Sequence, residues 1–185
     1  MNKTLEIINR RRSVRKFDKN VLSKADLQAI LEAGRRAPCA RNSQKRQFTV
    51  VQNKDILRTL CQEAKAVART FEDEYLRNLA NSDQDLLYGA STLIIVSGDN
   101  SYGMSESDCA AANQNMLIAA ESLGISSSWN NYITFLFQGE NANKIKETLG
   151  IPTEFKPYCS AIFGYTTVKP EARATITGNI VNYIH

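Results

Sequence analysis

One run of six residues limits the folds open to this 185-residue chain more than any other feature. Residues 92–97 read Thr-Leu-Ile-Ile-Val-Ser, and the middle of the run shows no alternation between apolar and polar positions. A strand that is apolar on both faces is typical of the centre of a sheet that helices cover on both sides. The run therefore predicts a layered protein in which this strand is central.

A well-marked helix is expected ahead of this strand, over residues 23–36. Ser23 is a natural N-cap with Asp26 three residues on, and Leu22 and Leu27 hold the two positions of a hydrophobic staple. The sequence thus predicts an amphipathic helix that packs against the sheet.

A second helix, expected over residues 110–123, is rich in apolar side chains and alanine. Ser105 and Asp108 offer a capping box ahead of it, and Gly124 offers a helix end. Because small side chains allow a close approach, we expect this helix in the core, with a possible role at a subunit contact.

The other expected elements follow from shorter patterns. They are a helix from about residue 4, a strand over 48–51, a helix that begins at Asn53, a strand or turn over 125–132, a short helix over 142–149, and strands over 158–163 and 179–184. The pattern does not define the boundaries of the elements within residues 67–90.

The length and charge of the chain limit the number of domains and the kinds of binding partner that we expect. A chain of 185 residues suits one domain, residues 1–185, and a net charge of +4 suits a small anionic ligand at least as well as duplex nucleic acid. The first residues lack the apolar run of a secretory signal, and no stretch reaches transmembrane length. We therefore expect a cytoplasmic protein that binds neither nucleic acid nor a membrane.

The residue types that carry most protein chemistry are sparse. Cys39, Cys61, Cys109 and Cys159 form no C-x-x-C pair, so we expect reduced thiols, without a zinc site or a disulfide. The only histidine is His185, which leaves little basis for a histidine metal centre or a Ser-His-Asp site. An enzyme of this composition would take its chemistry from a cofactor.

A basic stretch over residues 10–17, Arg-Arg-Arg-Ser-Val-Arg-Lys-Phe, is the first candidate site. Guanidinium groups offer paired donors to phosphate oxygens, and Ser13 adds a hydroxyl donor. The stretch fits the wall of an anion pocket. On these residues alone, a solvated helix end and a nucleic-acid patch remain the alternatives.

A polar loop over residues 37–44, Ala-Pro-Cys-Ala-Arg-Asn-Ser-Gln, is the second candidate site. Asn42 and Gln44 each carry a donor and an acceptor, as needed to bind the edge of a planar heterocycle. Asn and Gln are also common in loops for turn reasons, so a structural role is the alternative.

Taken together, these blocks resemble the FMN-dependent nitroreductase family, and the resemblance runs over nearly the whole chain. The matching blocks are residues 11–17, residues 37–39 with Asn42 and Gln44, residues 108–116 continuing to Gly124 and Trp129, and residues 164–165 with Arg173. Several blocks in this order and spacing are more specific than any one of them.

The resemblance implies an α+β fold, a three-layer α/β/α sandwich with a central mixed, mainly antiparallel sheet. It also implies an intertwined homodimer whose two FMN sites use residues of both subunits. The cofactor-binding residues that it implies are Arg11, Arg12, Ser13, Arg15, Pro38, Cys39, Ala40, Asn42, Gln44, Trp129, Asn130, Asn131 and Arg173.

The resemblance also implies a role for each group of residues. Arg11, Ser13 and Arg15 would hold the phosphate or ribityl chain, joined by Arg173, and Arg12 would contact the flavin edge. The loop over 38–44 would come from the partner subunit, while backbone over 129–131 would reach the N5 and O4 edge of the flavin.

The sequence departs from the family pattern in three places, at four residues. Cys39 stands where the family commonly has serine, Lys45 and Arg46 stand in place of Pro-Trp, and Glu171 stands where a second cation is common. Lys169 is a candidate substitute for that cation. Loop arginines such as Arg41 or Arg46 could meet the 2′-phosphate of NADPH or be merely solvated.

The resemblance implies an FMN-dependent oxidoreductase that passes a hydride from NADH or NADPH through flavin N5 to a nitroaromatic, a quinone or a similar small acceptor. Such a protein supplies binding, orientation and electrostatics, and it needs no nucleophile or histidine base. The sequence contains no G-x-G-x-x-G, which favours the nicotinamide as a visiting substrate. The alternative is a flavin-binding storage or sensing module with little turnover.

The apolar end of the chain, residues 179–184, leads to a separate expectation. Its side chains are too apolar for a free tail, and the polar connection ahead of it is long enough to cross a dimer surface. We expect it to add a strand to the partner's sheet, and a strand that returns to its own sheet is the alternative.

Overall fold

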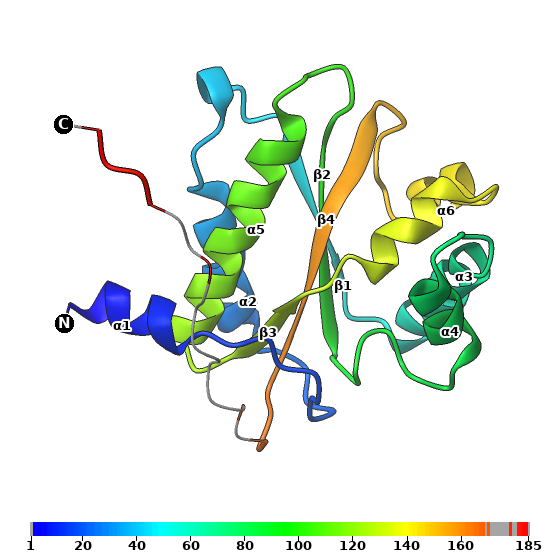
Figure 1. Cartoon of the computed structure of the whole chain (residues 1–185), viewed down its shortest axis with the longest axis horizontal. Coiled ribbons are helices and arrows are strands. Elements are labelled where there is room, and N and C mark those ends of the chain that lie inside the picture. The colour runs from blue at the N-terminus through cyan, green and yellow to red at the C-terminus, as the bar shows by residue number, and fades with distance from the viewer. Residues whose placement is uncertain (1, 169, 171–177, 179–180, 185) are drawn as a thin grey trace.

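Within the part of the chain that the structure describes, four antiparallel strands form a sheet that is the middle layer (Figure 1). The structure is a computed structural model that describes residues 2–168, 170, 178 and 181–184. Its strands are β1 (Arg46–Val51), β2 (Thr92–Asp99), β3 (Ser126–Trp129) and β4 (Phe155–Gly164), in the spatial order β1-β2-β4-β3. An isolated parallel bridge joins Ser13 to Ser127 at the edge strand β3.

Strand β2 lies inside the sheet and is buried on both faces, as its sequence predicts. It pairs with β1 on one side and with β4 on the other. Leu93 and Ile95 belong to one hydrophobic cluster, while Ile94 and Val96 belong to a second cluster on the opposite face. Because side chains of a strand alternate between faces, one apolar run supplies the centre of both clusters.

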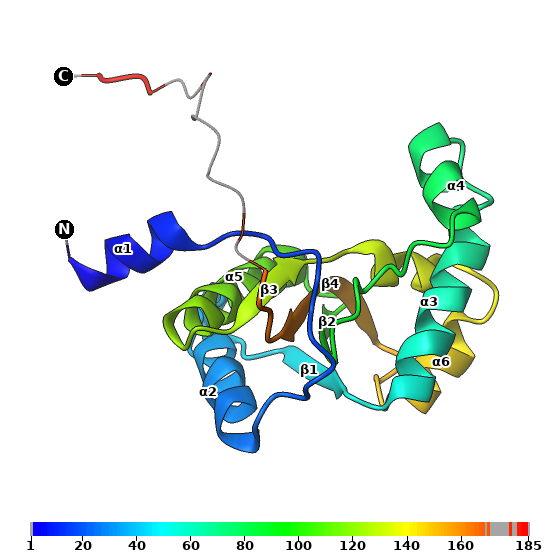
Figure 2. The ribbon, with the colours of Figure 1, turned by 90° about the horizontal axis from the view of Figure 1, so that it is seen from below.

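Helices cover both faces of this sheet (Figures 1 and 2). The α-helices are α1 (Lys3–Arg10), α2 (Lys24–Arg35), α3 (Lys54–Ala68), α4 (Glu74–Asn81), α5 (Ser105–Ser122) and α6 (Ala142–Thr148), with 3₁₀ segments η1 (Ala40–Asn42) and η2 (Tyr132–Gln138). The views place α2 and α5 on one face, and α3 and α6 on the other. The three-layer α/β/α sandwich is confirmed.

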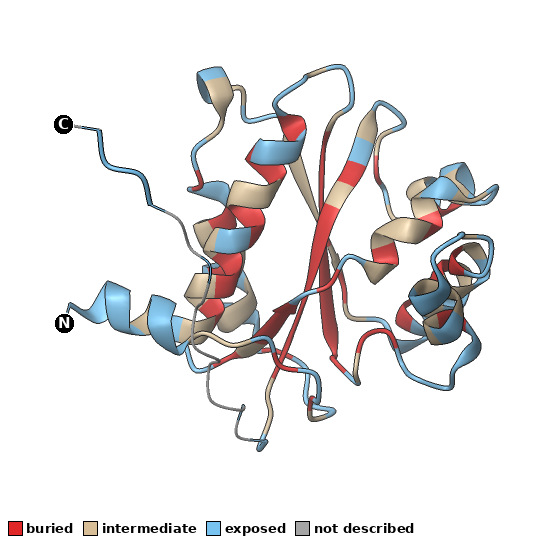
Figure 3. Ribbon diagram, in the orientation of Figure 1, coloured by how far each residue is buried: buried red, intermediate tan, exposed pale blue. Residues whose placement is uncertain are grey.

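Burial follows this layering. The buried residues run along the sheet and along the facing side of α5 (Figure 3). None of the described helices combines the length and the hydropathy that are needed to cross a membrane.

Two predicted helix starts are confirmed by their caps. The Ser23 hydroxyl accepts a hydrogen bond from the Asp26 N–H at 3.1 Å, at the start of α2. The Asn53 side chain accepts from the N–H groups of Asp55 and Ile56 at the start of α3. In the region that the sequence leaves open, α3 ends at Ala68 and α4 begins after a new cap, Asp73.

The predicted capping box at Ser105 and Asp108 is wrong. Helix α5 already includes Ser105, and its N-cap residue, Met104, makes no side-chain cap hydrogen bond. The Ser105 hydroxyl donates instead to the Asp99 carbonyl at 2.7 Å, and the Asp108 carboxylate accepts from the Ala40 N–H at 3.0 Å. Both side chains are engaged by distant parts of the chain, which a local pattern does not reveal.

The C-terminal segment is described only in part. Residues 179 and 180 of the expected strand lie outside the described residues, and 181–184 carry no strand assignment. Val181, Tyr183 and Ile184 are exposed. The exchange of this strand to a partner subunit stays a prediction.

Truncation of β2 on either face should destabilise the fold strongly. Leu93→Ala and Ile94→Ala each remove a fully buried side chain from a different cluster, so each should lower the free energy of unfolding by about 2–5 kcal/mol. Val21→Ala is the control, because this exposed side chain should change the value by about 0.5 kcal/mol or less. Chemical denaturation measures all three, and an effect confined to one face would contradict the two-sided core.

Candidate functional site

The basic stretch crosses the edge of the sheet as an extended segment held by two buried anchors. The Val14 N–H donates to the Ser127 carbonyl at 3.0 Å, and the Phe17 N–H donates to the Tyr88 carbonyl at 3.2 Å. The side chains of Val14 and Phe17 are both buried. These anchors fix the path of the segment on the sheet.

The polar side chains on either side of the Val14 anchor face outward. Ser13 and Arg15 are exposed on either side of buried Val14, as alternation along an extended segment requires. No carboxylate of the described residues lies within ion-pair distance of Arg15. Arg12 is half-buried, and its Nη1 atom has no hydrogen-bond partner among the described residues. Because an unsatisfied buried donor is costly, these arginines fit an anionic ligand.

Arg15 shares a cavity of about 140 Å³ with the turn that follows β3. The cavity is lined by Arg15, Tyr88, Ser128, Trp129, Asn130, Asn131, Tyr132 and Phe135. The structure therefore brings together one residue of the basic stretch and all three expected residues of the turn.

The side chains of Asn130 and Asn131 hold this turn in place. Asn130 Nδ2 donates to the Leu86 carbonyl at 2.6 Å. Asn131 Oδ1 accepts from Trp129 Nε1 at 2.8 Å and from the Ser160 N–H at 3.2 Å. Since the protein itself uses these side-chain groups, contact with a ligand would fall to the backbone of the turn.

The second candidate, the 37–44 loop, lies at the other end of helix α5. Its Ala40 N–H donates to Asp108 near the start of α5, whereas Arg10 pairs with Glu121 near the helix end, with an Nε to Oε1 distance of 2.6 Å. At 1.5 Å of rise per residue, the two contact points on α5 are about 20 Å apart. One chain therefore does not bring the loop and the basic stretch together.

The loop has an unusual backbone. Arg41, Asn42 and Gln44 have φ angles of 53°, 50° and 52°, in the left-handed region. This conformation costs most L-residues about 1–2 kcal/mol each, although asparagine adopts it more readily. Cys39 Sγ accepts from the Gln44 N–H at 3.4 Å, so this thiol supports the loop.

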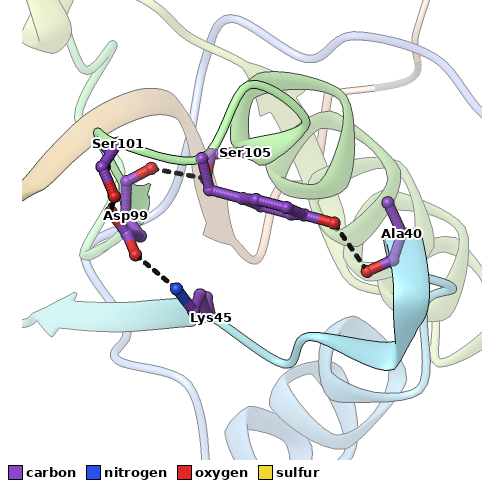
Figure 4. Close-up of polar contacts among 6 residues, drawn as sticks. Ala40, Lys45, Asp99, Ser101 and Ser105 are labelled. Carbon is purple, nitrogen blue, oxygen red and sulfur yellow. Dashed lines mark hydrogen bonds and ion pairs between the residues drawn. The ribbon is translucent and has the colours of Figure 1, made fainter.

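The two unusual residues after the loop make structural contacts. Lys45 pairs with Asp99, with an Nζ to Oδ2 distance of 2.7 Å (Figure 4). Arg46 donates to the backbone carbonyls of Ala37, Pro38 and Asp108. The alternative that Arg46 meets a 2′-phosphate is not supported, because its guanidinium is directed to these carbonyls.

Three residues named from the sequence lie outside the described residues. These are Arg173, Glu171 and Lys169. The role expected for Arg173 stays a prediction.

An aromatic group that no sequence pattern indicated lies beside the Arg15 cavity. Tyr132 and Phe135, which line the cavity, lie in η2, and the Tyr132 hydroxyl is 3.1 Å from that of Tyr75 in α4. The Phe135 ring packs edge-on against Phe71, with 5.1 Å between ring centroids. Nothing in the sequence places Phe71 and Tyr75 near the turn after β3.

The hydroxyl of Tyr132 is held in its protonated form. Burial, and then the hydrogen bond with Tyr75, raise the pKa of Tyr132 above its usual range. At neutral pH this residue is therefore an uncharged hydrogen-bonding group at the cavity.

Two larger cavities lie away from these residues. One, of about 580 Å³, lies between α3 and the 83–91 segment, and the other, of about 630 Å³, lies beside α6 and the start of β4. Neither is lined by a residue of the basic stretch or of the 37–44 loop. Size alone therefore does not identify the site.

The fold and the site together define the class to which the protein belongs. The protein is an α+β sandwich with an antiparallel sheet, and an exposed arginine lies beside a small aromatic cavity at the edge of that sheet. The model of the Nitroreductase family matches residues 8–165. The chain belongs to the nitroreductase family.

Individual relatives agree with this assignment. A crystal structure of a nitroreductase with bound FMN from Desulfitobacterium hafniense DCB-2 is 31% identical, with a TM-score of 0.91 and full coverage of both chains. Another, from Bacteroides fragilis NCTC 9343, also with bound FMN, is 34% identical, with a TM-score of 0.87 and coverage of 98% of this chain and 100% of that one. An Archaeoglobus fulgidus protein named "Putative NADH dehydrogenase/NAD(P)H nitroreductase" is 31% identical over 89% of this chain and 86% of its own length.

The ion pair beside the loop gives a pH prediction. The hydrogen bond from Lys45, and then those from Ser101, lower the pKa of Asp99 to about 2. A carboxyl whose pKa is lower in the folded state stabilises the fold above its unfolded pKa of about 4, and this contribution is lost as the pH falls toward 2. Lys45→Met should raise the pKa of Asp99 toward its usual value, as measured by the carboxyl carbon shift during a pH titration. Lys54→Met, far from Asp99 in the fold, is the control, and an Asp99 pKa that Lys45→Met leaves unchanged would contradict the assigned cause.

Proposed function

We propose that the protein is an FMN-dependent oxidoreductase that passes a hydride from NADH or NADPH to a small acceptor such as a nitroaromatic or a quinone. The observation that carries the proposal is the convergence of Arg15 and the 129–131 turn on one cavity. Membership of the nitroreductase family, and FMN in two solved relatives, support it.

In this proposal the basic stretch binds the anionic end of the cofactor. Arg15 and Ser13 face outward together and would share the phosphate, with Arg11 beside them. Arg12 offers its Nη1 donor to the flavin edge. Charge-assisted hydrogen bonds of this kind are among the stronger ones in proteins.

FMN, when bound, would supply the redox chemistry, which is hydride transfer at its N5 atom. The chain would supply binding and orientation. The turn after β3 would border the ring, and the nearby arginines would stabilise negative charge there.

The aromatic group favours a planar acceptor. Tyr132 and Phe135 lie at the cavity, and Tyr75 and Phe71 extend the aromatic surface beyond it. Offset or edge-on contacts between such rings and an aromatic ligand are favourable. The Tyr132 hydroxyl also offers an acceptor oxygen a hydrogen-bonding group at the cavity.

The proposed active form is a homodimer. The 37–44 loop of one subunit would complete the flavin site at the basic stretch of the other, which accounts for their separation within one chain. The exposed apolar residues Leu5 and Ile8 of α1 support a subunit contact. The proposed strand exchange over 179–184 would add to it.

The absorption spectrum and the turnover of the purified protein test this function. We expect a flavin spectrum, and flavin-dependent oxidation of NADH or NADPH with a quinone acceptor. Flavin that is reduced on mixing but never turns over with any acceptor would favour a storage or sensing module. A protein that neither retains nor takes up FMN would contradict the proposal.

The proposed phosphate contact can be tested at Arg15. Arg15→Ala should weaken FMN binding by about 1.5–3 kcal/mol, because it removes a charge-assisted hydrogen bond. Lys16→Ala is the matched control, since it removes the same charge from the adjacent exposed position. Fluorescence titration of the flavin-free protein with FMN measures both. Equal effects of the two substitutions would show a general effect of charge and not a contact by Arg15.

A further inference from the structure

Arg46 makes an unusual set of contacts at the start of β1. Its Nη1 atom donates to the carbonyls of Pro38, at 3.2 Å, and of Asp108, at 3.0 Å. Its Nη2 atom donates to the Ala37 carbonyl at 2.9 Å. One guanidinium thus ties the first residues of the 37–44 loop to the first turn of α5. A planar group with several fixed donors suits this task, and a lysine does not have this geometry.

Two further side chains hold the next part of the loop. The Asp108 carboxylate, which is buried, accepts from the Ala40 N–H at 3.0 Å. The Tyr102 hydroxyl donates to the Ala40 carbonyl at 3.0 Å. Both backbone groups of Ala40 are therefore engaged by side chains from outside the loop.

The segment that carries Tyr102 is itself fixed to β1. Figure 4 shows Lys45 directed at Asp99, with Ser101 and Ser105 around the same residue. Lys45 Nζ also lies 5.7 Å from the centroid of the Tyr102 ring. Lys45, which directly follows the loop, therefore ties the loop's end to the segment that carries Tyr102.

These contacts end where the strained backbone begins. Ala37, Pro38 and Ala40 are held from outside, whereas Arg41, Asn42 and Gln44 have left-handed φ angles and are exposed. A strained conformation persists only when its surroundings fix it. Gln44 Nε2 also donates to Asn42 Oδ1 at 3.3 Å, so these two polar side chains lie together.

We propose that Arg46, with Asp108 and Tyr102, holds the 37–44 loop in the shape that presents Asn42 and Gln44 to the flavin of the partner subunit. Arg46 is thus a positioning residue, which acts through the loop and does not touch the ligand. This inference rests on the proposed flavin function. It gives a role to an arginine that is unusual for the family at this position.

The test compares substitutions at Arg46 with one at a nearby arginine. Arg46→Met keeps the apolar stem and removes every donor, while Arg46→Lys keeps the charge but not the planar donor geometry. Arg36→Met is the matched control, because the Arg36 side chain is exposed and pairs only with Glu32 of its own helix among the described residues. Tyr102→Phe, which removes a single hydroxyl, serves if the Arg46 variants do not fold.

Three measurements are made on the full-length chain. They are the FMN dissociation constant of the flavin-free protein, backbone hydrogen exchange over residues 37–44 without flavin, and the reduction potential of the bound flavin. We expect Arg46→Met to weaken FMN binding about ten- to a hundredfold, to speed exchange in the loop and to shift the potential. Arg46→Lys should resemble Arg46→Met, Tyr102→Phe should show a smaller effect in the same direction, and Arg36→Met should match the wild type.

The outcomes separate the two proposals. A wild-type chain that binds no FMN would overturn both. A wild-type chain that binds FMN, with an unchanged dissociation constant and potential in Arg46→Met, would overturn only the positioning role. Wild-type behaviour of Arg46→Lys would also overturn it, because charge alone would then account for the effect. If only Tyr102→Phe can be measured, unchanged loop exchange and FMN binding would count against the proposal.

Discussion

Burial of β2 on both faces is the constraint on which the rest of the structure depends. Leu93 and Ile95 face one cluster and Ile94 and Val96 face the other, so helices must cover both sides of the sheet. Helix α5 lies along one of these faces and links the two candidate regions. In its first turn, Asp108 accepts a hydrogen bond from the Ala40 N–H of the 37–44 loop. In its last turn, Glu121 forms an ion pair with Arg10. The layered core therefore holds the two regions apart.

This separation shapes the functional account. The basic stretch and the turn after β3 meet at one small cavity, which offers Arg15 and an aromatic wall. The loop that carries Asn42 and Gln44 is held at the far end of α5 and is exposed. A second copy of the chain, placed so that its loop reaches the first copy's arginines, would join the two parts. The proposed dimer is therefore part of the proposed site.

Local patterns predicted the parts of the fold that depend on local chemistry. The apolar run of β2 and the caps at Ser23 and Asn53 were readable, because each signal lies within a few residues. The capping box at Ser105 and Asp108 failed, since both side chains serve contacts with residues far away in the sequence. Short motifs cannot tell a cap from such a tertiary contact.

In the candidate site, too, the sequence did not reveal contacts between residues that are far apart in the chain. The residue types of the basic stretch indicated an anion pocket, and the extended segment exposes both Ser13 and Arg15. The inward direction of Arg46 was not predictable, because the carbonyls that it reaches come from two separate segments. The contact of Tyr75 with Tyr132 was not predictable either, because the two residues are 57 positions apart in the sequence. A single sequence gives the residue types of a site more readily than their partners.

Subunit complementation tests the central claim most directly. Chains with Arg15→Ala and chains with Arg46→Met are co-expressed with different affinity tags, and the heterodimer is isolated. If each site combines the basic stretch of one subunit with the loop of the other, one site of the heterodimer carries both substitutions and the other carries neither. The account predicts one FMN per heterodimer with wild-type affinity. A heterodimer in which no FMN binds with wild-type affinity would contradict it, because each site would then lie within one chain.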